Sequence, residues 1–255
     1  MPYLDRAGAH IFYEVTGDAR SQPPLLLSHG FGASSAMWQP NIDALAADRP
    51  VIAWDLCGHG RSDSPADPAR YAHAACVADM AALLDAAGAE RAVAGGLSLG
   101  GFLSLAFCLE MPHRVAGLVL CDTGPGFRSE EARERWNNRA LALADRLDHD
   151  GLRALGDDSG PAAAGHRSAS GLALAARNML TQPDSRVIDA LASIRVPVLV
   201  LVGERDEAFL GAAGYIAAKI PGAQKIVIPG GGHMCNIDQP ELFNEAVLAF
   251  LDSLP

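Results

Sequence analysis

The stretch Val93-Ala94-Gly95-Gly96-Leu97-Ser98-Leu99-Gly100-Gly101-Phe102 decides the fold, because an apolar run there meets a serine with glycine two positions away on either side. A helical pattern follows at once. This spacing is typical of a nucleophile elbow, a tight strand-to-helix turn that leaves no room for side chains at the flanking positions. We therefore predict that Ser98 is a nucleophile. The N–H of Leu99 and the positive end of the following helix are expected to face the space above its hydroxyl.

Short apolar runs alternate with helical patterns on both sides of this elbow. The runs at 25–27, 51–54, 115–121 and 196–202 have almost no polar residues, which is typical of strands buried on both faces of a sheet. Regular alternation of this kind predicts a mostly parallel sheet with helices on both faces. Ligands bind at the carboxyl ends of the strands in such sheets. The polar residues that directly follow strands are His29, Asp55, Ser98 and Asp122.

The alternation breaks between residues 127 and 192. Helical patterns at about 129–148 and 169–180 are separated there by a Gly- and Asp-rich loop at 156–161. We predict that residues 127–192 form a helical cap over the carboxyl edge of the sheet, and that residues 1–126 and 193–255 form the α/β core. Trp136 and Met179 are the candidate substrate-binding residues of this cap.

A serine nucleophile at neutral pH needs a base, and the base needs an acid to orient it. His233 is the candidate base, because it follows a late strand in a glycine-rich loop and comes after Ser98 in the chain. Asp206 is the candidate acid, since it follows the apolar run 196–202 and precedes His233 by 27 residues. Its neighbours Glu204 and Glu207 are alternatives. Asp122, after the preceding strand, is another, although Asp-Thr-Gly-Pro is also a turn signal in its own right.

The oxyanion of an acyl-transfer reaction needs two N–H donors. Leu99 is expected to provide one and Phe31, in the loop after the strand at 25–28, the other. We interpret His29 as a buried, hydrogen-bonded anchor of this loop. The segment from Asp55 to Asp63, with a histidine inside it, is interpreted as a tight structural turn rather than a metal site, because its ligand spacing is loose.

Composition narrows the possible partners. The chain has 255 residues, a formal net charge of −10 and no block of lysines and arginines, which disfavours nucleic acid and anionic membranes as partners. It has no apolar run approaching the ~18 residues of a membrane span and no leader pattern, so we expect a cytoplasmic protein. The five cysteines are scattered, which predicts buried, reduced thiols rather than a disulfide framework or a zinc site. A monomer and a small homo-oligomer are both compatible with the sequence.

Several motifs resemble those of the α/β-hydrolase fold superfamily and occur in the same order: His29-Gly30-Phe31-Gly32, the D-x-x-G-H-G-R-S-D pattern of 55–63, Gly96 to Gly100, Gly203-Glu204-Arg205-Asp206, and Gly232-His233. Within this superfamily, the elbow and the segment after His233 look like those of small bacterial carboxylesterases and 3-oxoadipate enol-lactonases. Leu97 and Cys57 depart from the commoner residues at their positions. Neither departure removes a catalytic group.

The residues and the resemblance together predict hydrolysis of a small carboxylic ester or lactone through an acyl-enzyme on Ser98, without a cofactor or a metal. Three alternatives stay open. An enol-lactonase needs a cation for its substrate's carboxylate, for which Arg177 in the cap is the candidate. A carbon–carbon bond hydrolase uses the same three side chains. The third alternative is not primarily an enzyme but a ligand receptor with slow residual hydrolysis.

Overall fold

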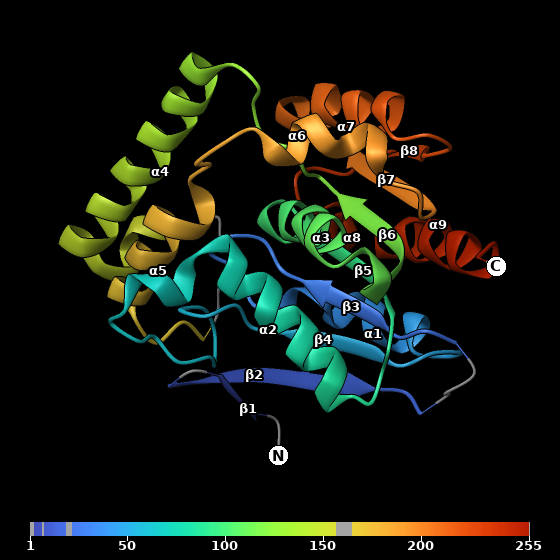
Figure 1. The fold of residues 1–255 in the computed structure, drawn as a ribbon, viewed down its shortest axis with the longest axis horizontal. Helices are drawn as coiled ribbons and strands as arrows, with labels where there is room; N and C mark the ends of the chain where they lie inside the picture. The colour runs from blue at the N-terminus through green and yellow to red at the C-terminus, as the bar shows by residue number, and fades with distance from the viewer. Residues whose placement is uncertain (1–2, 7, 19–21, 157–164, 255) are drawn as a thin grey trace.

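Eight strands form one sheet in the spatial order β1-β2-β4-β3-β5-β6-β7-β8 (Figure 1). This computed structural model describes residues 3–6, 8–18, 22–156 and 165–254. Residues 157–161 of the expected cap loop lie outside these ranges. The strands are β1 (Tyr3–Arg6), β2 (Ala9–Thr16), β3 (Leu25–Ser28), β4 (Val51–Trp54), β5 (Ala92–Leu97), β6 (Val115–Cys121), β7 (Val198–Gly203) and β8 (Gln224–Ile228).

The strands from β3 to β8 are parallel to their neighbours, whereas β1 and β2 add an antiparallel edge. The register aligns Leu97 at the end of β5 with Cys121 at the end of β6, and places Gly96 opposite Ser28 of β3. The loops after these central strands therefore leave the sheet at one edge. The predicted mostly parallel α/β sheet is confirmed.

Helices cover both faces of the sheet (Figure 1). Alternate strand residues point to opposite sides, so Leu26 and Leu118 pack in one apolar cluster while Leu25 and Val119 pack in the other. The first cluster is closed by α2 (His73–Ala86), α3 (Leu99–Glu110) and α7 (Glu207–Lys219). The second is closed by α1 (Gln39–Leu45), α8 (Cys235–Asp238) and α9 (Pro240–Asp252). Short 3₁₀ turns occupy Ser35–Trp38, Pro68–Tyr71, Pro112–Arg114, Gly151–Leu155 and Leu191–Ser193.

We use the name cap for α4 (Glu130–Asp150), α5 (Ala169–Ala175) and a π-helical turn, Ala176–Leu180, which lie within the segment expected to form one. Their small apolar residues form a separate cluster that includes Ala144, Leu147 and Leu172. The last helix of the inserted segment, α6 (Arg186–Ala190), lies away from α4 and α5 and contacts α3 (Figure 1). Its Val187 and Ile188 pack against the main core, which makes α6 part of the core layer rather than of the cap. The segment 127–192, which is expected to form the cap, thus includes one helix that packs on the core.

Helix α4 extends over 21 residues and stands out from the sheet (Figure 1). Ser129 caps it by accepting a hydrogen bond from the N–H of Ala132, and Glu130 and Glu131 lie in its first turn, where the helix dipole favours negative charge. Only its small and apolar residues Ala140, Ala144 and Leu147 are buried. Within the described ranges, no helix combines the length and apolar character needed to cross a membrane.

Candidate active site

Ser98 occupies the single position between the end of β5 and the start of α3. Its φ of 54° lies in the left-handed region, which non-glycine residues adopt at a cost of about 1–3 kcal/mol and which is enriched at functional sites. A Cβ on Gly96 would overlap the backbone of Gly100, and a Cβ on Gly100 would overlap the backbone of Ser28. The two glycines are therefore required by the close crossing of strand and helix, as the elbow motif predicts.

The elbow is braced by the neighbouring strand. The N–H of Ser98 donates to the carbonyl of Cys121 at 2.9 Å, and the hydroxyl of Thr123 donates to the carbonyl of Ser98 at 2.6 Å. Leu99 is the first residue of α3, so its N–H has no acceptor within the helix. The strained serine is thus held by contacts to residues at and just after the end of β6, while the first N–H groups of α3 are left without acceptors inside the helix.

The loop after β3 passes directly beside Ser98. A Cβ on Gly30 would lie 3.5 Å from the Cβ of Ser98, which places the Gly30–Phe31 backbone next to the nucleophile. His29 anchors this loop: its Nδ1–H donates to the carbonyl of Gly30 at 2.7 Å, and its Nε2 accepts from the N–H of Leu56 at 2.9 Å. Burial lowers the pKa of His29 to about 4, so the ring is neutral and suited to this donor and acceptor pair. The predicted anchoring role of His29 is confirmed.

The cap contributes a second anchor that sequence reasoning missed. His166 Nε2–H donates to the carbonyl of Gly32 at 2.8 Å, while its Nδ1 accepts from the N–H of Gly60 at 3.0 Å. One side chain therefore joins the loop beside Ser98 to the turn after β4. Nothing in the sequence around position 166 signals this role, because both contacts are to backbone atoms more than 100 residues away.

Asp206 and His233 are hydrogen-bonded, with His233 Nδ1 at 2.8 Å from Asp206 Oδ2. Asp206 is 7% exposed, whereas the His233 side chain is 43% exposed. The loops that carry them are tied together by the N–H of Arg205, which donates to the carbonyl of Gly231 at 2.8 Å. Glu204, one of the alternative acids, instead accepts the N–H of Gly230 at 2.9 Å. The carboxylate that orients the His233 ring is thus that of Asp206.

Asp122, the other alternative acid, is fully buried and turned away from this pair. Its Oδ1 accepts the N–H of Gly203 at 2.7 Å, and its Oδ2 accepts the thiol of Cys121 at 3.2 Å. Burial raises the pKa of Asp122 above its ordinary value. Its contacts join the ends of β6 and β7 rather than orienting a histidine.

The His233 ring stacks on Phe209, with centroids 4.9 Å apart and planes inclined by 28°. Phe209 and Ser98 line the same cavity, so the histidine lies behind one wall of the space above the nucleophile. Within the described residues, no hydrogen bond joins Ser98 to His233.

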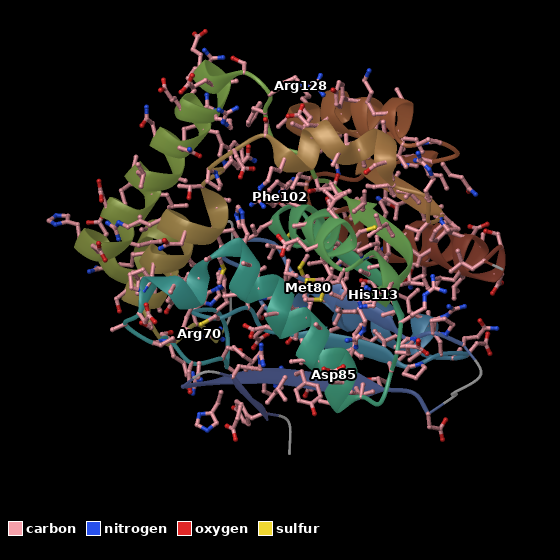
Figure 2. All side chains as sticks on the ribbon, viewed as in Figure 1. Arg70, Met80, Asp85, Phe102, His113 and Arg128 are labelled. Carbon is pink, nitrogen blue, oxygen red and sulfur yellow. The ribbon has the colours of Figure 1, made fainter. Side chains whose placement is uncertain are left out.

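That cavity has a volume of about 240 Å³ and lies between the elbow and the cap. Phe102 lines it from the side of α3 that faces α4 and α5 (Figure 2). Trp136 and Met179, the predicted substrate-binding residues, both line it, whereas Phe31 does not. The Phe31 ring packs instead against His59 at 5.3 Å. The remaining lining residues are Leu99, Thr123, Gly124, Pro125, Gly126, Phe127, Arg139, Leu180, Gln182, Ala208 and Ala212.

The cavity has an arginine in its lining, but not the one that the sequence analysis named. Arg177, the candidate cation for a substrate carboxylate, forms ion pairs with Asp145 at 2.7 Å and Asp148 at 2.8 Å and does not line the cavity. Arg139 of α4 lines the cavity instead and is its one charged lining residue among those described. The expectation for Arg177 is therefore wrong, because the side of α4 that carries aspartates neutralises it.

The turn from Asp55 to Asp63 is structural, as predicted. Asp55 is fully buried and accepts the N–H groups of Ser35 at 2.7 Å and Arg61 at 2.8 Å. A Cβ on Gly60 would overlap the Asp55 carboxylate, so glycine is required there. Burial lowers the pKa of His59 well below its ordinary value. The Asp55 carboxylate of this turn therefore binds backbone N–H groups of the chain around it.

A larger cavity, of about 520 Å³, lies at the amino ends of β3, β4 and β5, away from the elbow. It is lined mainly by proline, alanine and glycine, together with Asp18, Glu90 and Arg91. Its described lining contains no serine, cysteine or histidine. We therefore place the candidate active site in the smaller cavity, where the strained serine lies.

Comparisons with known proteins agree with this fold. Residues 23–166 match a family described as alpha/beta hydrolase fold. The chain is 30% identical over 245 residues, 89% of both proteins, to a putative 2-succinyl-6-hydroxy-2,4-cyclohexadiene-1-carboxylate synthase of Bacillus subtilis.

Two solved structures are also similar. One is a thermophilic esterase from Thermogutta terrifontis with malate bound, with a TM-score of 0.81, 29% identity, and coverage of 98% of this chain and 96% of that one. The other is the enol-lactonase from Burkholderia xenovorans, with a TM-score of 0.81, 25% identity, and coverage of 99% and 100%.

Proposed function

We propose that this chain, which belongs to the α/β-hydrolase fold family, hydrolyses a carboxylic ester or lactone through Ser98. The observation that carries the proposal is the hydrogen bond of 2.8 Å between Asp206 and His233, whose ring stacks on a wall of the cavity that Ser98 lines. Nucleophilic acyl transfer needs a serine and an imidazole that a carboxylate orients toward it. Esterase and enol-lactonase relatives support the same class of reaction.

In the proposed reaction, His233 Nε2 takes the proton of the Ser98 hydroxyl as its oxygen attacks the substrate carbonyl carbon. The N–H groups of Leu99 and Phe31 bind the oxyanion, and the imidazolium then gives its proton to the leaving alcohol. Water, deprotonated by His233, attacks the acyl-enzyme and releases the acid. Asp206 keeps the Nδ1 proton of His233 in place and stabilises the imidazolium.

The test is a panel of p-nitrophenyl esters and lactones of graded size. A cavity of about 240 Å³ with a largely apolar lining favours short acyl groups. We expect turnover to fall as the acyl chain lengthens, and mass spectrometry of the quenched enzyme to locate the acyl group on Ser98. Hydrolysis with an acyl group on any other residue would contradict the proposal.

A narrower substrate class is favoured by Arg139. It is the one charged residue of the described lining, in a chain of net charge −10. A substrate that carries a carboxylate in addition to its ester or lactone would pair with this guanidinium. The name of the Bacillus subtilis relative describes a product that itself carries a carboxylate.

Replacing Arg139 by glutamine is expected to raise KM for ethyl hydrogen succinate by roughly 10-fold to 100-fold, the equivalent of about 1.5–3 kcal/mol for a hydrogen bond to a charged group. KM for the uncharged ester ethyl butanoate should change little, because its methyl group makes no ion pair. The measurement is steady-state kinetics on both esters. Arg135→Gln is the matched control, because Arg135 lies one turn earlier on α4, pairs with Glu131 and does not line the cavity. An equal loss on both esters would show that Arg139 acts on the fold of the cap instead.

A further inference from the structure

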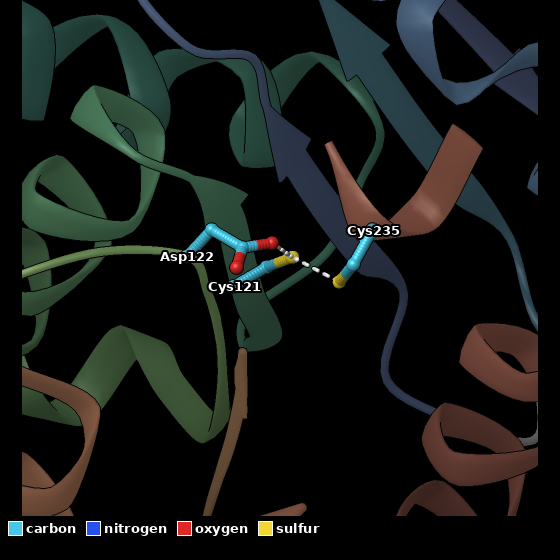
Figure 3. A group of neighbouring side chains, drawn as sticks. All are labelled: Cys121, Asp122 and Cys235. Atoms are coloured by element: carbon cyan, nitrogen blue, oxygen red, sulfur yellow. Dashed lines mark hydrogen bonds between the residues drawn. The ribbon is translucent and has the colours of Figure 1, made fainter. Parts of the chain in front are cut away.

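Two cysteines that are 114 residues apart in the chain meet behind the candidate active site (Figure 3). Cys121 is the last residue of β6, and Cys235 is the first residue of α8. Their sulfur atoms are 3.5 Å apart, and Asp122 Oδ2 lies 3.2 Å from the sulfur of Cys121. All three side chains are fully buried. The scattered cysteine spacing of the sequence gave no sign of this convergence.

The backbone is shaped to bring the three groups together. Successive residues of a strand point to opposite faces, but Asp122 has a φ of 43°, a left-handed conformation that turns its carboxylate toward the thiol of Cys121 (Figure 3). A Cβ on Gly231 would lie 2.8 Å from the Cβ of Cys235, so glycine at 231 gives Cys235 its place. A strained aspartate and a required glycine thus maintain the cluster.

We propose that Cys121, Asp122 and Cys235 form a binding site for a thiophilic divalent cation of the zinc group. Two sulfur atoms bound to one such ion at about 2.3 Å with tetrahedral angles lie about 3.8 Å apart, so the sulfur atoms at 3.5 Å need to separate by only a few tenths of an ångström. Two thiolates with one carboxylate select zinc and cadmium over magnesium and calcium.

The charge of the cluster supports the same conclusion. The Asp122 carboxylate accepts both an N–H and an S–H donor, which suits its ionised form, and the cluster then carries one negative charge. Binding of a divalent cation releases the two thiol protons and leaves two thiolates, one carboxylate and one M²⁺, again with one negative charge. The protein interior therefore gains no additional net charge when the ion binds.

Occupation of the site would act on the catalytic groups through the chain. Cys235 follows His233 by two residues, and Asp122 holds the N–H of Gly203, three residues before Asp206. Drawing the sulfur and carboxylate atoms onto an ion moves both loops that position the acid and the base. We therefore expect an inhibitory site, a consequence that rests on the proposed function, whereas the binding itself does not.

The test is titration of the reduced full-length protein with Cd²⁺, followed by the ultraviolet charge-transfer band of cadmium thiolates. The band should grow to one equivalent and disappear on addition of excess Zn²⁺, while Mg²⁺ has no effect. Cys121→Ser and Cys235→Ser should each lose most of the band. Cys108→Ser, which removes a buried thiol of α3, should keep all of it. Ester turnover should fall in proportion to the band.

Other outcomes overturn the proposal. A missing band, or an unchanged band in both Cys121→Ser and Cys235→Ser, shows that the ion binds elsewhere or not at all. Loss of ester turnover with Cd²⁺ in the absence of the band shows that the cation acts at the catalytic histidine and not at the thiols. If circular dichroism shows that a serine variant is misfolded, Asp122→Asn provides the second variant. Its affinity for Cd²⁺ should be lower, so the band should rise more gradually with added Cd²⁺. The band reports binding even if the chain hydrolyses no ester, so its failure and the failure of the proposed function are distinguishable.

Discussion

Ser98→Ala is expected to lower kcat for a short p-nitrophenyl ester by about 10³-fold to 10⁶-fold. The substitution removes the oxygen that becomes acylated, so the two-step route is lost. Only the polarisation of the carbonyl by the N–H groups of the elbow remains, and this sustains a small residual rate. The turn itself should be preserved in this variant, because Gly96 and Gly100 still allow the close crossing of strand and helix. The measurement is kcat under saturating ester, with circular dichroism to verify the fold.

Ser104→Ala is the matched control for this variant. Ser104 is a buried serine of α3 whose hydroxyl donates to the carbonyl of Gly100 at 2.8 Å, and it does not line the cavity. Its loss should cost stability of about 1 kcal/mol and leave kcat within a few-fold of the parent chain. Comparable losses of kcat in both variants would mean that each substitution perturbs α3 as a whole. This result would contradict the assignment of Ser98 as the nucleophile.

The sequence predicted the parts of the site that local chemistry determines. The glycines beside Ser98 follow from steric exclusion at a strand-to-helix turn, and this exclusion is visible in a window of five residues. The contact between Asp206 and His233 was predictable because each follows a strand of the same parallel sheet, and the carboxyl ends of neighbouring strands meet at one edge. Two residues that are 27 positions apart in the chain are therefore hydrogen-bonded, because the strands that precede them are neighbours in the sheet.

The parts that were missed depend on how segments without a strong local signal pack on each other. The apolar face of a cap helix indicates its buried side but not what packs against it, so the sequence did not show that Arg139 lines the cavity while Arg177 pairs with aspartates of α4. His166 reaches backbone atoms of two distant turns, and backbone acceptors leave no trace in the sequence. Cys121 and Cys235 meet because α8 packs under the end of β6, a contact set by the whole second cluster of the core.

Asp206→Asn is expected to lower kcat by about 10⁴-fold while leaving the fold intact. An asparagine at this position can donate its amide N–H to Nδ1 of His233, which moves the ring proton to Nε2. The nitrogen that faces the substrate side then carries a proton and no longer accepts one from Ser98. Since asparagine has nearly the same shape and Asp206 makes its side-chain contact with the ring, the geometry of the loop is preserved. The measurement is kcat across the pH range, with the parent chain in parallel.

Variants of the other carboxylates near this loop test whether the loss of kcat is specific to Asp206. Glu207→Gln changes an exposed neighbour in the first turn of α7 and should leave kcat within a few-fold of the parent value. Asp122→Asn weakens the brace between the ends of β6 and β7, so it should cost activity, but at least a hundred times less than Asp206→Asn, because it leaves the tautomer of His233 unchanged. A loss in Asp122→Asn as large as that in Asp206→Asn would transfer the role of the acid to Asp122. The hydrogen bond at 2.8 Å would then be a structural contact only.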